Sequence, residues 1–449
     1  ARGYTLFFML FFIGLGITGA VMPRAAAAMH NGAWSFLVGV LVLSLLSWQG
    51  EMNLLTAVVS FVLIAATQWL LPQVGVQANE RYEKLPRLQQ RSTRWLVGAA
   101  LLVVLLFLPP FAGLSLTNTL NLTALYITMG IGLSVMIGYA GLLDLGYVAT
   151  YAVGAYTIGL LTTPSLLTCG GMTPDQISAA GLTIPQACTG VMTFWQGMPL
   201  AVLASACTGI LLGVPVLRLR GDYLAIVTLG FGEIIQVLIK STTFKPLLGG
   251  AQGIISIPLP ELNLSFLNQS WDFRLAKSTE VYYLYIFGVM VAAFIVTRLI
   301  HTRLGRAWRA MREDEDVAEA MGINLVGTKL LAFAISSAFA GLGGAIFGTT
   351  FQSIFPNSFT LVVSINVLSL IIIGGMGSIP GVILGSLILI GLPEVLRELQ
   401  DYRLLAFGAL LVAVMILKPE GLLPPQPAKL SEEATDAESV LKRQPQGAD

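Results

Sequence analysis

The stretch from Trp95 to Leu217 contains no lysine or arginine, and its only acidic residues are Asp144 and Asp175. Charged residues make up 11% of the chain, against about 25% in ordinary soluble domains. Hydrophobic residues make up 55%. So few charges cannot cover the surface of a secreted globule or a soluble enzyme, and a net charge of +1 excludes a nucleic-acid binder. The sequence therefore predicts an all-α, polytopic membrane protein.

Apolar runs long enough to cross a bilayer, about 20 residues each, recur along the chain. We expect ten to thirteen spans in one transmembrane helical bundle, with the shortest runs tilted, re-entrant or merely buried. The candidates are Tyr4–Met22, Ala33–Trp48, Asn53–Leu71, Trp95–Gly113, Thr119–Gly138, Tyr147–Leu161, Met198–Leu217, Tyr223–Lys240, Val281–Ile300, Thr328–Thr350, Leu361–Met376, Pro380–Leu396 and Arg403–Leu417.

Basic residues between the spans indicate which side is cytoplasmic, because lysine and arginine concentrate there. Pro72–Arg94 and His301–Gly327 are rich in arginine and are predicted to be cytoplasmic. Thr163–Gly197 has no basic residue and is predicted to be external. Counting spans between these anchors places the tail from Lys418 on the cytoplasmic side of the inner (plasma) membrane.

The chain is predicted to have three parts. Residues 1–94 hold extra spans and a basic cytoplasmic linker, residues 95–423 form the core, and residues 424–449 are polar, proline-rich and disordered. Cys169 and Cys188 lie in the external loop, where oxidation is permitted. They are either a disulfide closing that loop or two unrelated thiols.

Two glycine clusters interrupt otherwise apolar stretches. Gly138 and Gly141 flank the first break, and Gly374, Gly375 and Gly377 make up the second. Broken helices in corresponding halves of a membrane protein are one indication of a translocation pathway. Tight helix packing without any pathway explains the same glycines.

Acidic residues inside spans are candidate sites, because a charge in the bilayer is costly. Asp144 follows the first break, and Asp222 opens a span, where it suits an N-cap or first-turn acid. Glu233 lies near the middle of Tyr223–Lys240. The preferred interpretation of Glu233 is a carboxyl hydrogen-bonded to a neighbouring helix, and the alternative is a pathway or ion-coupling group.

The loop Arg303–Gly327 has the most informative pattern. Arg306, Arg309 and Arg312 recur every three residues, an acidic block follows, and Ala318–Gly322 is a small-residue turn. The pattern predicts a short helix at the membrane surface that ends at a glycine. A solvated connector obeying the positive-inside rule accounts for the arginines but not for the acidic and small-residue turn.

No residues for catalysis, a metal or a cofactor are apparent. His30 and His301 have no Cys or His partners at ligand spacing. Gly322–Lys329 superficially resembles a phosphate-binding loop, but its order is Gly-Thr-Lys and no apolar strand precedes it. We therefore expect neither an enzyme nor an ATP site of its own.

Several motifs together resemble the branched-chain amino-acid ABC transporter permease family, in its LivM-type subunit. Asp316–Gly322 is similar to the Glu-Ala-Ala-x-x-x-Gly loop of ABC importer permeases, with Asp for Glu and Val for the first Ala. Longer similar stretches are Gly138–Tyr156, Pro215–Glu233, Leu304–Gly341, Ile373–Gly377 and Lys418–Leu422. The resemblance covers roughly Thr119 to Leu422 and leaves the first three spans and the cysteine-containing insert uncovered.

The resemblance implies a permease that works with a second homologous permease, two ABC ATPase subunits that bind ATP and Mg²⁺, and an external substrate-binding protein. Its substrate would be a neutral or branched-chain amino acid, with urea or a short amide as the alternative. The candidate ATPase-coupling residues are Arg309, Arg312, Glu313, Asp314, Asp316, Ala318, Glu319 and Gly322. The candidate pathway residues are Gly138, Gly141, Asp144, Glu233, Gly374, Gly375 and Gly377.

A second class of function stays open at this point. An ion-coupled secondary carrier would use Glu233 and Asp144 as coupling groups, although such carriers usually have more acidic groups facing one another. An intramembrane enzyme or assembly scaffold is a third class, and no reactive constellation supports it.

Overall fold

The computed structural model describes residues 116–164, 191–217, 222–266, 269–274 and 278–391, with Pro109, Leu219 and isolated positions from 408 to 423. The chain divides into two units, Ala1–Leu108 and Pro109–Asp449, and every described residue belongs to the second. The first three candidate spans, the basic linker, the loop with Cys169 and Cys188, and the tail lie outside the described residues.

Six helices in the described part are long and apolar enough to cross a membrane, and they match six of the predicted spans. They are Leu116–Tyr139, Phe194–Val216, Tyr223–Lys240, Glu280–Ile300, Leu325–Phe351 and Pro356–Gly374. The predicted short span at Tyr147 is a helix of 16 residues, or about 24 Å. Most of its residues are buried, so it is an internal helix of the bundle, one of the options expected for the short runs.

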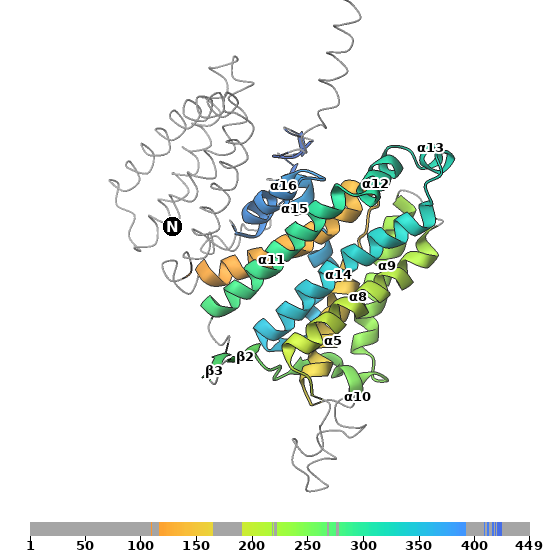
Figure 1. The fold of residues 1–449 in the computed structure, drawn as a ribbon. Coiled ribbons are helices and arrows are strands. Elements are labelled where there is room, and N and C mark those ends of the chain that lie inside the picture. Colours follow the sequence, from red (N-terminus) through yellow and green to blue (C-terminus); the bar gives the residue numbers. More distant parts are fainter. Residues whose placement is uncertain are drawn as a thin grey trace, which may run out of the picture. The chain divides into compact units, whose positions relative to one another are not determined.

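Figure 1 shows the arrangement of these elements. The first described helix, Leu116–Tyr139, ends in the π-helix η1 (Val135–Tyr139). The elements that follow are α5 (Tyr147–Thr162), α8 (Phe194–Val216), α9 (Asp222–Lys240), α10 (Lys245–Leu248), η2 (Gly250–Gln252), β1 (Ile254–Ile255), β2 (Glu261–Phe266), β3 (Gln269–Arg274), α11 (Ser278–Ile300), α12 (Arg303–Glu313), α13 (Glu315–Ala320), α14 (Leu325–Phe351), β4 (Ser353–Ile354), η3 (Pro356–Ser358), α15 (Leu361–Gly374), α16 (Ile379–Ser386) and η4 (Leu387–Gly391).

Helix α14 packs against both α5 and α8 and forms the centre of the described bundle (Figure 1). Glycines set the spacing. A β-carbon added at Gly154 of α5 would lie 2.4 Å from the Cα of Gly341, and one added at Gly209 of α8 would lie 2.5 Å from the Cβ of Ser337. Helices in lipid gain little from apolar burial, so such close backbone contact supplies the dispersion energy that holds them together.

The prediction of an all-α fold is confirmed for the bundle, and four short strands are added to it. β1 pairs antiparallel with β4 over two residues, and β2 pairs antiparallel with β3 from Glu261–Arg274 to Phe266–Gln269. These strands lie between spans, where short polar connections carry only a weak hydrophobic pattern, so the sequence indicated only a loop.

Candidate functional site

The arginine-rich loop between α11 and α14 folds into two short helices, α12 and α13, where the sequence predicted one. Gly305, Trp308 and Met311 recur every three residues on one face of α12, and all three are buried. The Nε1 of Trp308 donates a hydrogen bond of 3.0 Å to the carbonyl oxygen of Thr328 in α14. Helix α12 is therefore anchored to the central helix by a fully buried indole.

Helix α13 begins at a side-chain cap. The Asp314 carboxylate accepts hydrogen bonds from the backbone nitrogens of Asp316 and Val317, at 2.9 and 3.0 Å. Amides in the first turn of a helix have no partner within the helix, and an aspartate at the N-cap satisfies them. Within the acidic block, Asp314 thus has a structural role as the N-cap of α13.

Helix α13 ends at a glycine, as the sequence predicted. The nitrogen of Gly322 donates to the carbonyl of Glu319 at 2.9 Å, and that of Ile323 donates to Ala318 at 3.0 Å. Gly322 has a φ of +85°, which a residue without a β-carbon adopts without strain. This pair of bonds is the Schellman pattern of a helix C-terminus. It fixes the direction in which the chain leaves α13 toward α14.

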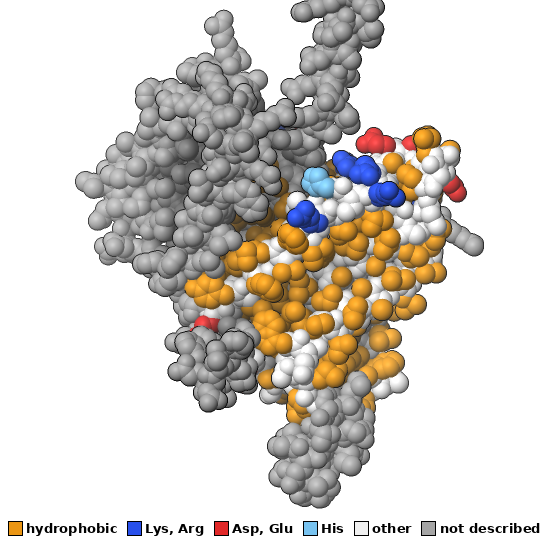
Figure 2. Space-filling view, in the orientation of Figure 1, with side chains coloured by type: hydrophobic (Ala, Val, Ile, Leu, Met, Phe, Trp, Pro, Cys, Tyr) orange, Lys and Arg blue, Asp and Glu red, His pale blue; other side chains and the backbone are white. Residues whose placement is uncertain are grey.

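The surface of α13 carries acidic and apolar side chains side by side. Val317 is 59% exposed and Met321 is 79% exposed, and Asp316 and Glu319 are exposed with them. Figure 2 shows the acidic and apolar atoms together at this corner of the molecule. We refer to these four residues as the α13 tip. Val317 in α13 and Met321 just after it thus leave most of their apolar surface outside this chain's own core.

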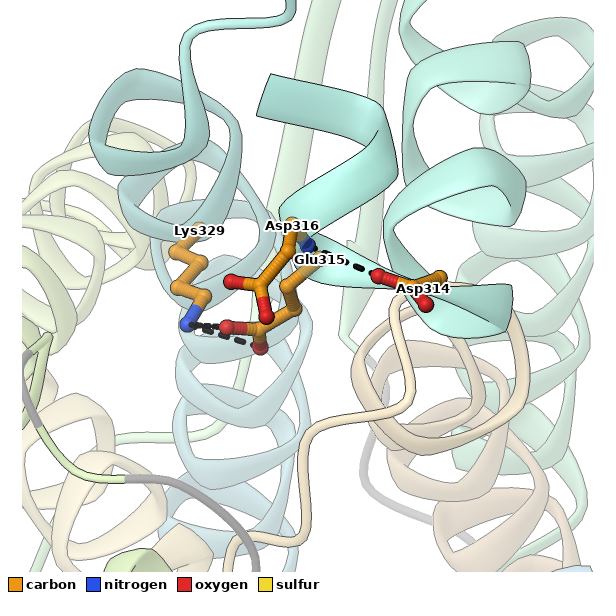
Figure 3. A network of polar contacts seen from close by, with 4 residues as sticks. All are labelled: Asp314, Glu315, Asp316 and Lys329. Atoms are coloured by element: carbon orange, nitrogen blue, oxygen red, sulfur yellow. Dashed lines mark hydrogen bonds and ion pairs between the residues drawn. The ribbon is translucent and has the colours of Figure 1, made fainter. Parts of the chain in front are cut away.

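An ion pair ties α13 to α14. The Nζ of Lys329 lies 2.8 Å from both carboxylate oxygens of Glu315, as Figure 3 shows. The Lys329 side chain is 5% exposed and that of Glu315 is 21% exposed. Because both charges are largely removed from water, each depends on the other for compensation.

Replacing Lys329 with methionine is expected to destabilise the folded chain by up to about 3 kcal/mol, because the Glu315 carboxylate would be left without its cation. The thermal unfolding midpoint of the purified protein in detergent measures this loss. The double variant Glu315→Gln with Lys329→Met removes both charges and should recover part of it. A double variant that is no more stable than Lys329→Met alone would contradict the assignment.

The side chain of Arg312 connects α12 to the first helix break. Its Nη1 donates a hydrogen bond of 2.5 Å to the carbonyl oxygen of Gly138, at the end of the 116–139 helix. Gly141 has a φ of +73°, and a β-carbon there would lie 2.9 Å from the Cγ of Arg312. At the first break, Arg312 therefore bonds the carbonyl of Gly138 and packs against the backbone of Gly141, which has no side chain in the way.

The two helix breaks contact each other at the same place. The Oη of Tyr139 donates a hydrogen bond of 2.6 Å to the carbonyl oxygen of Gly377. A β-carbon added at Gly138 would lie 2.5 Å from the nitrogen of Gly377. We call this contact between Arg312, Gly138, Tyr139 and Gly377 the junction.

A segment near the end of the core completes the second break. The nitrogens of Leu422 and Leu423 donate to the carbonyls of Ile373 and Gly374, each at 2.9 Å. These carbonyls belong to the last turn of α15, where no partner within the helix is available. Parts of four stretches that resemble the permease family, Gly138–Tyr156, Leu304–Gly341, Ile373–Gly377 and Lys418–Leu422, thus meet at one end of the bundle.

Asp144 is 6% exposed and lies just before α5. One carboxylate oxygen accepts a hydrogen bond of 2.8 Å from the nitrogen of Gly146. The nitrogen of Val148 donates to the Oγ of Ser364 at 3.0 Å. Side chains of this chain thus bond two of the amides at the start of α5.

Glu233 is exposed on α9, and among the residues that the structure describes it has no hydrogen bond to a neighbouring helix of the kind that was the preferred interpretation. Asp144 is buried, so the two acids do not form the facing pair expected of coupling groups in a carrier. Helix α9 begins at Asp222, as predicted for an acid at a helix start.

Sequence reasoning did not select Lys329, Trp308 or Tyr139. Lys329 had a usable signal, because it is a lone cation inside the predicted span Thr328–Thr350 and an intramembrane charge requires a partner. Tyr139 had none, because its partner is 238 residues away in the sequence. In the part of the chain that the structure describes, no three His, Cys, Asp or Glu residues gather at a metal-binding distance.

Comparison with known proteins gives a consistent result. The model of the family "Branched-chain amino acid transport system / permease component" matches residues 115–417. The high-affinity branched-chain amino acid transport system permease protein LivM is 40% identical in Escherichia coli K12 and 39% in Salmonella typhimurium, over 72% of this chain and 74% of each relative. The corresponding permease LivH of Escherichia coli K12 is 26% identical over 68% of this chain and 93% of its own length. No solved structure matches. The junction, the capped α13 loop and the membrane helices thus belong to a chain that is a member of the branched-chain amino acid transport system permease family.

Proposed function

We propose that this chain is the membrane-spanning permease subunit of an ATP-driven ABC importer for branched-chain and other neutral amino acids. The family membership and the printed activity of LivM and LivH support the substrate class. The chain carries out no covalent step. ATP and Mg²⁺ bind to separate ATPase subunits, whose hydrolysis of ATP supplies the energy.

The observation that carries this proposal is the junction. Arg312 lies on the loop that bears the α13 tip, and its guanidinium holds the carbonyl of Gly138. Tyr139 then connects the first break to the second through Gly377. A displacement of the loop is thereby delivered to two broken helices at once, which is what an external source of mechanical energy requires.

The α13 tip suits a docking contact with the ATPase subunits. Val317 and Met321 offer apolar area, and Asp316 and Glu319 offer charges that select a partner with basic groups. The Trp308 bond and the Lys329–Glu315 ion pair hold the loop rigidly to α14. A force on the tip therefore moves the loop and α14 together instead of bending the loop.

The loop is cytoplasmic in this proposal, because Arg303, Arg306, Arg309 and Arg312 follow the positive-inside rule. Leu422 and Leu423 bond the end of α15 beside the junction, which supports a cytoplasmic C-terminus. The complete assembly in a bacterial inner membrane contains a second homologous permease, two ATPases and an external binding protein.

The test is uptake into proteoliposomes. Vesicles holding this chain with its companion permease and ATPases, and supplied externally with the binding protein, should accumulate leucine only when ATP and Mg²⁺ are present on the ATPase side. Parallel assays with valine, urea and acetamide define the substrate class.

Two outcomes would overturn parts of this proposal. Uphill leucine uptake by vesicles holding this chain alone, driven by a sodium or proton gradient, would establish the secondary carrier instead. Uptake of urea without uptake of leucine would retain the ABC mechanism and replace the substrate.

A further inference from the structure

Helix α9 exposes a carboxylate in the middle of a membrane-spanning segment. Glu233 is exposed, and it is followed by only seven residues before α9 ends at Lys240, a rise of about 10 Å. It makes no hydrogen bond or ion pair with the residues that the structure describes. A charged side chain at this depth is costly against lipid, so the face that carries it requires water or polar groups.

An exposed surface runs along most of α9 on the side that carries Glu233. Ile226, Gly230, Glu233 and Val237 are spaced by four, three and four residues and share one face of α9. Ile226 is 64% exposed and Val237 is 66% exposed, and a β-carbon at Gly230 would have nothing within 4 Å. We refer to these four residues as the α9 stripe.

The opposite face of α9 is packed. Leu224 and Thr228 are each 2% exposed, and the hydroxyl of Thr228 accepts a hydrogen bond of 3.1 Å from the nitrogen of Leu145. This face covers the segment between the first break and α5. The rotation of α9 is therefore fixed, and the stripe cannot turn inward to bury its carboxylate.

Other exposed helices differ from α9. The outward side chains of α8 include Leu203, Leu211 and Val214, exposed by 53–71%, and those of α11 include Phe287 and Phe294, exposed by 50% and 63%. Helix α8 has no charged residue, and the two charged residues of α11, Glu280 and Arg298, lie in its first and last turns. Those faces are compatible with lipid, whereas the α9 stripe is not.

We infer that the α9 stripe lines the aqueous translocation pathway between this chain and its companion permease, and that Glu233 binds the ammonium group of the amino acid in transit. A carboxylate accepts strong, charge-assisted hydrogen bonds from an ammonium. The apolar positions on the same face, Ile226 two turns before Glu233 and Val237 one turn after it, suit an aliphatic side chain. This inference rests on the proposed function, since it names the group that meets that function's substrate.

The first test measures water access with cysteine variants of the complete complex. Glu233→Cys should react with water-soluble methanethiosulfonates at least about tenfold faster than Phe294→Cys on α11, because only an ionised, hydrated thiol reacts. The wild-type chain, which contains Cys169, Cys188 and exposed Cys207, is treated in parallel as the background. Equal, slow reaction at 233 and 294 would overturn the inference.

The second test exchanges the charge at a single position. Glu233→Cys should reduce the maximal leucine uptake rate about tenfold. Modification by the negatively charged sulfonatoethyl reagent should restore part of the rate, and modification by the positively charged trimethylammonium reagent should not. Equal effects of the two reagents, or an unchanged rate in Glu233→Cys, would refute a role in ammonium binding.

These failures differ from a failure of the proposed function. The inference is tested against a wild-type complex that imports leucine with ATP, and its refutation leaves that import intact. Without ATP-dependent import by the wild-type complex, the proposed function itself is refuted. The labelling contrast between positions 233 and 294 still decides whether the stripe is hydrated.

Discussion

Replacing Arg312 with alanine is expected to reduce ATP-driven leucine uptake at least about tenfold while the ATPase subunits remain bound to the permease. The variant loses the hydrogen bond from Nη1 to the Gly138 carbonyl. Hydrogen bonds from charged groups contribute about 1.5–3 kcal/mol, and about 1.4 kcal/mol corresponds to tenfold. Retention of the ATPases follows because the α13 tip, with Val317 and Met321, is unaltered. Uptake and co-purification, measured on one preparation, separate the two effects.

A matched control is available on the same helix. Arg306 is exposed, and its Nη1 reaches only the nearby carbonyl of His301 at 3.5 Å. Arg306→Ala removes the same positive charge without touching either helix break, so it should retain most of the uptake. Arg312→Lys keeps the charge and loses the planar guanidinium, so an intermediate rate is expected. If Arg312→Ala and Arg306→Ala transport equally well, the junction does not transmit the motion.

The contrast between these arginines shows how far the sequence leads. Their spacing every three residues predicted a surface helix, and α12 confirms it. The spacing treated Arg309 and Arg312 alike, yet Arg309 bonds the carbonyls of Gly305 and Ile300 close by in the chain. Only Arg312 crosses to Gly138, 174 residues away. Local periodicity has no access to such a long-range partner.

The parts of the fold that follow from local rules were predictable. Apolar length located the six described spans, and the glycine stop of α13 at Gly322 follows from a backbone conformation that side chains disfavour. The exposure of Glu233 was not predictable, because it depends on which helices cover α9 in three dimensions. The sequence around an isolated acid in a span does not distinguish an acid that faces a neighbouring helix from one that faces open space.

The glycine breaks also combine a feature that the sequence located with a packing arrangement that it did not predict. Sequence located them at Gly138–Gly141 and Gly374–Gly377 and left open whether they served packing or a pathway. The structure places the two breaks against each other and against Arg312, so close packing is present at the junction itself. Their candidate role in the pathway stays a prediction.

Replacing Gly138 with alanine is expected to destabilise the protein and to reduce uptake more than Arg312→Ala does. The new β-carbon would lie 2.5 Å from the nitrogen and 2.8 Å from the Cα of Gly377. Both are backbone atoms, so one break must move away from the other. Overpacking of this kind costs about 1–3 kcal/mol. The displacement also carries the Gly138 carbonyl away from Arg312 and the Tyr139 hydroxyl away from Gly377, so the whole junction is lost with one methyl group.

Gly230→Ala gives the matched comparison, because its β-carbon has nothing within 4 Å. Alanine is favoured over glycine within a helix by up to about 1 kcal/mol, so this variant should unfold at the same temperature as the wild type or higher. The same propensity gain is available to Gly138, which lies in the helical segment Val135–Tyr139, and would by itself raise stability. A lower unfolding midpoint for Gly138→Ala would therefore report the clash with Gly377, because helix propensity alone would raise the midpoint. A Gly138→Ala variant as stable as Gly230→Ala would mean that the two breaks separate without cost, and a contact of that kind could not carry force between them.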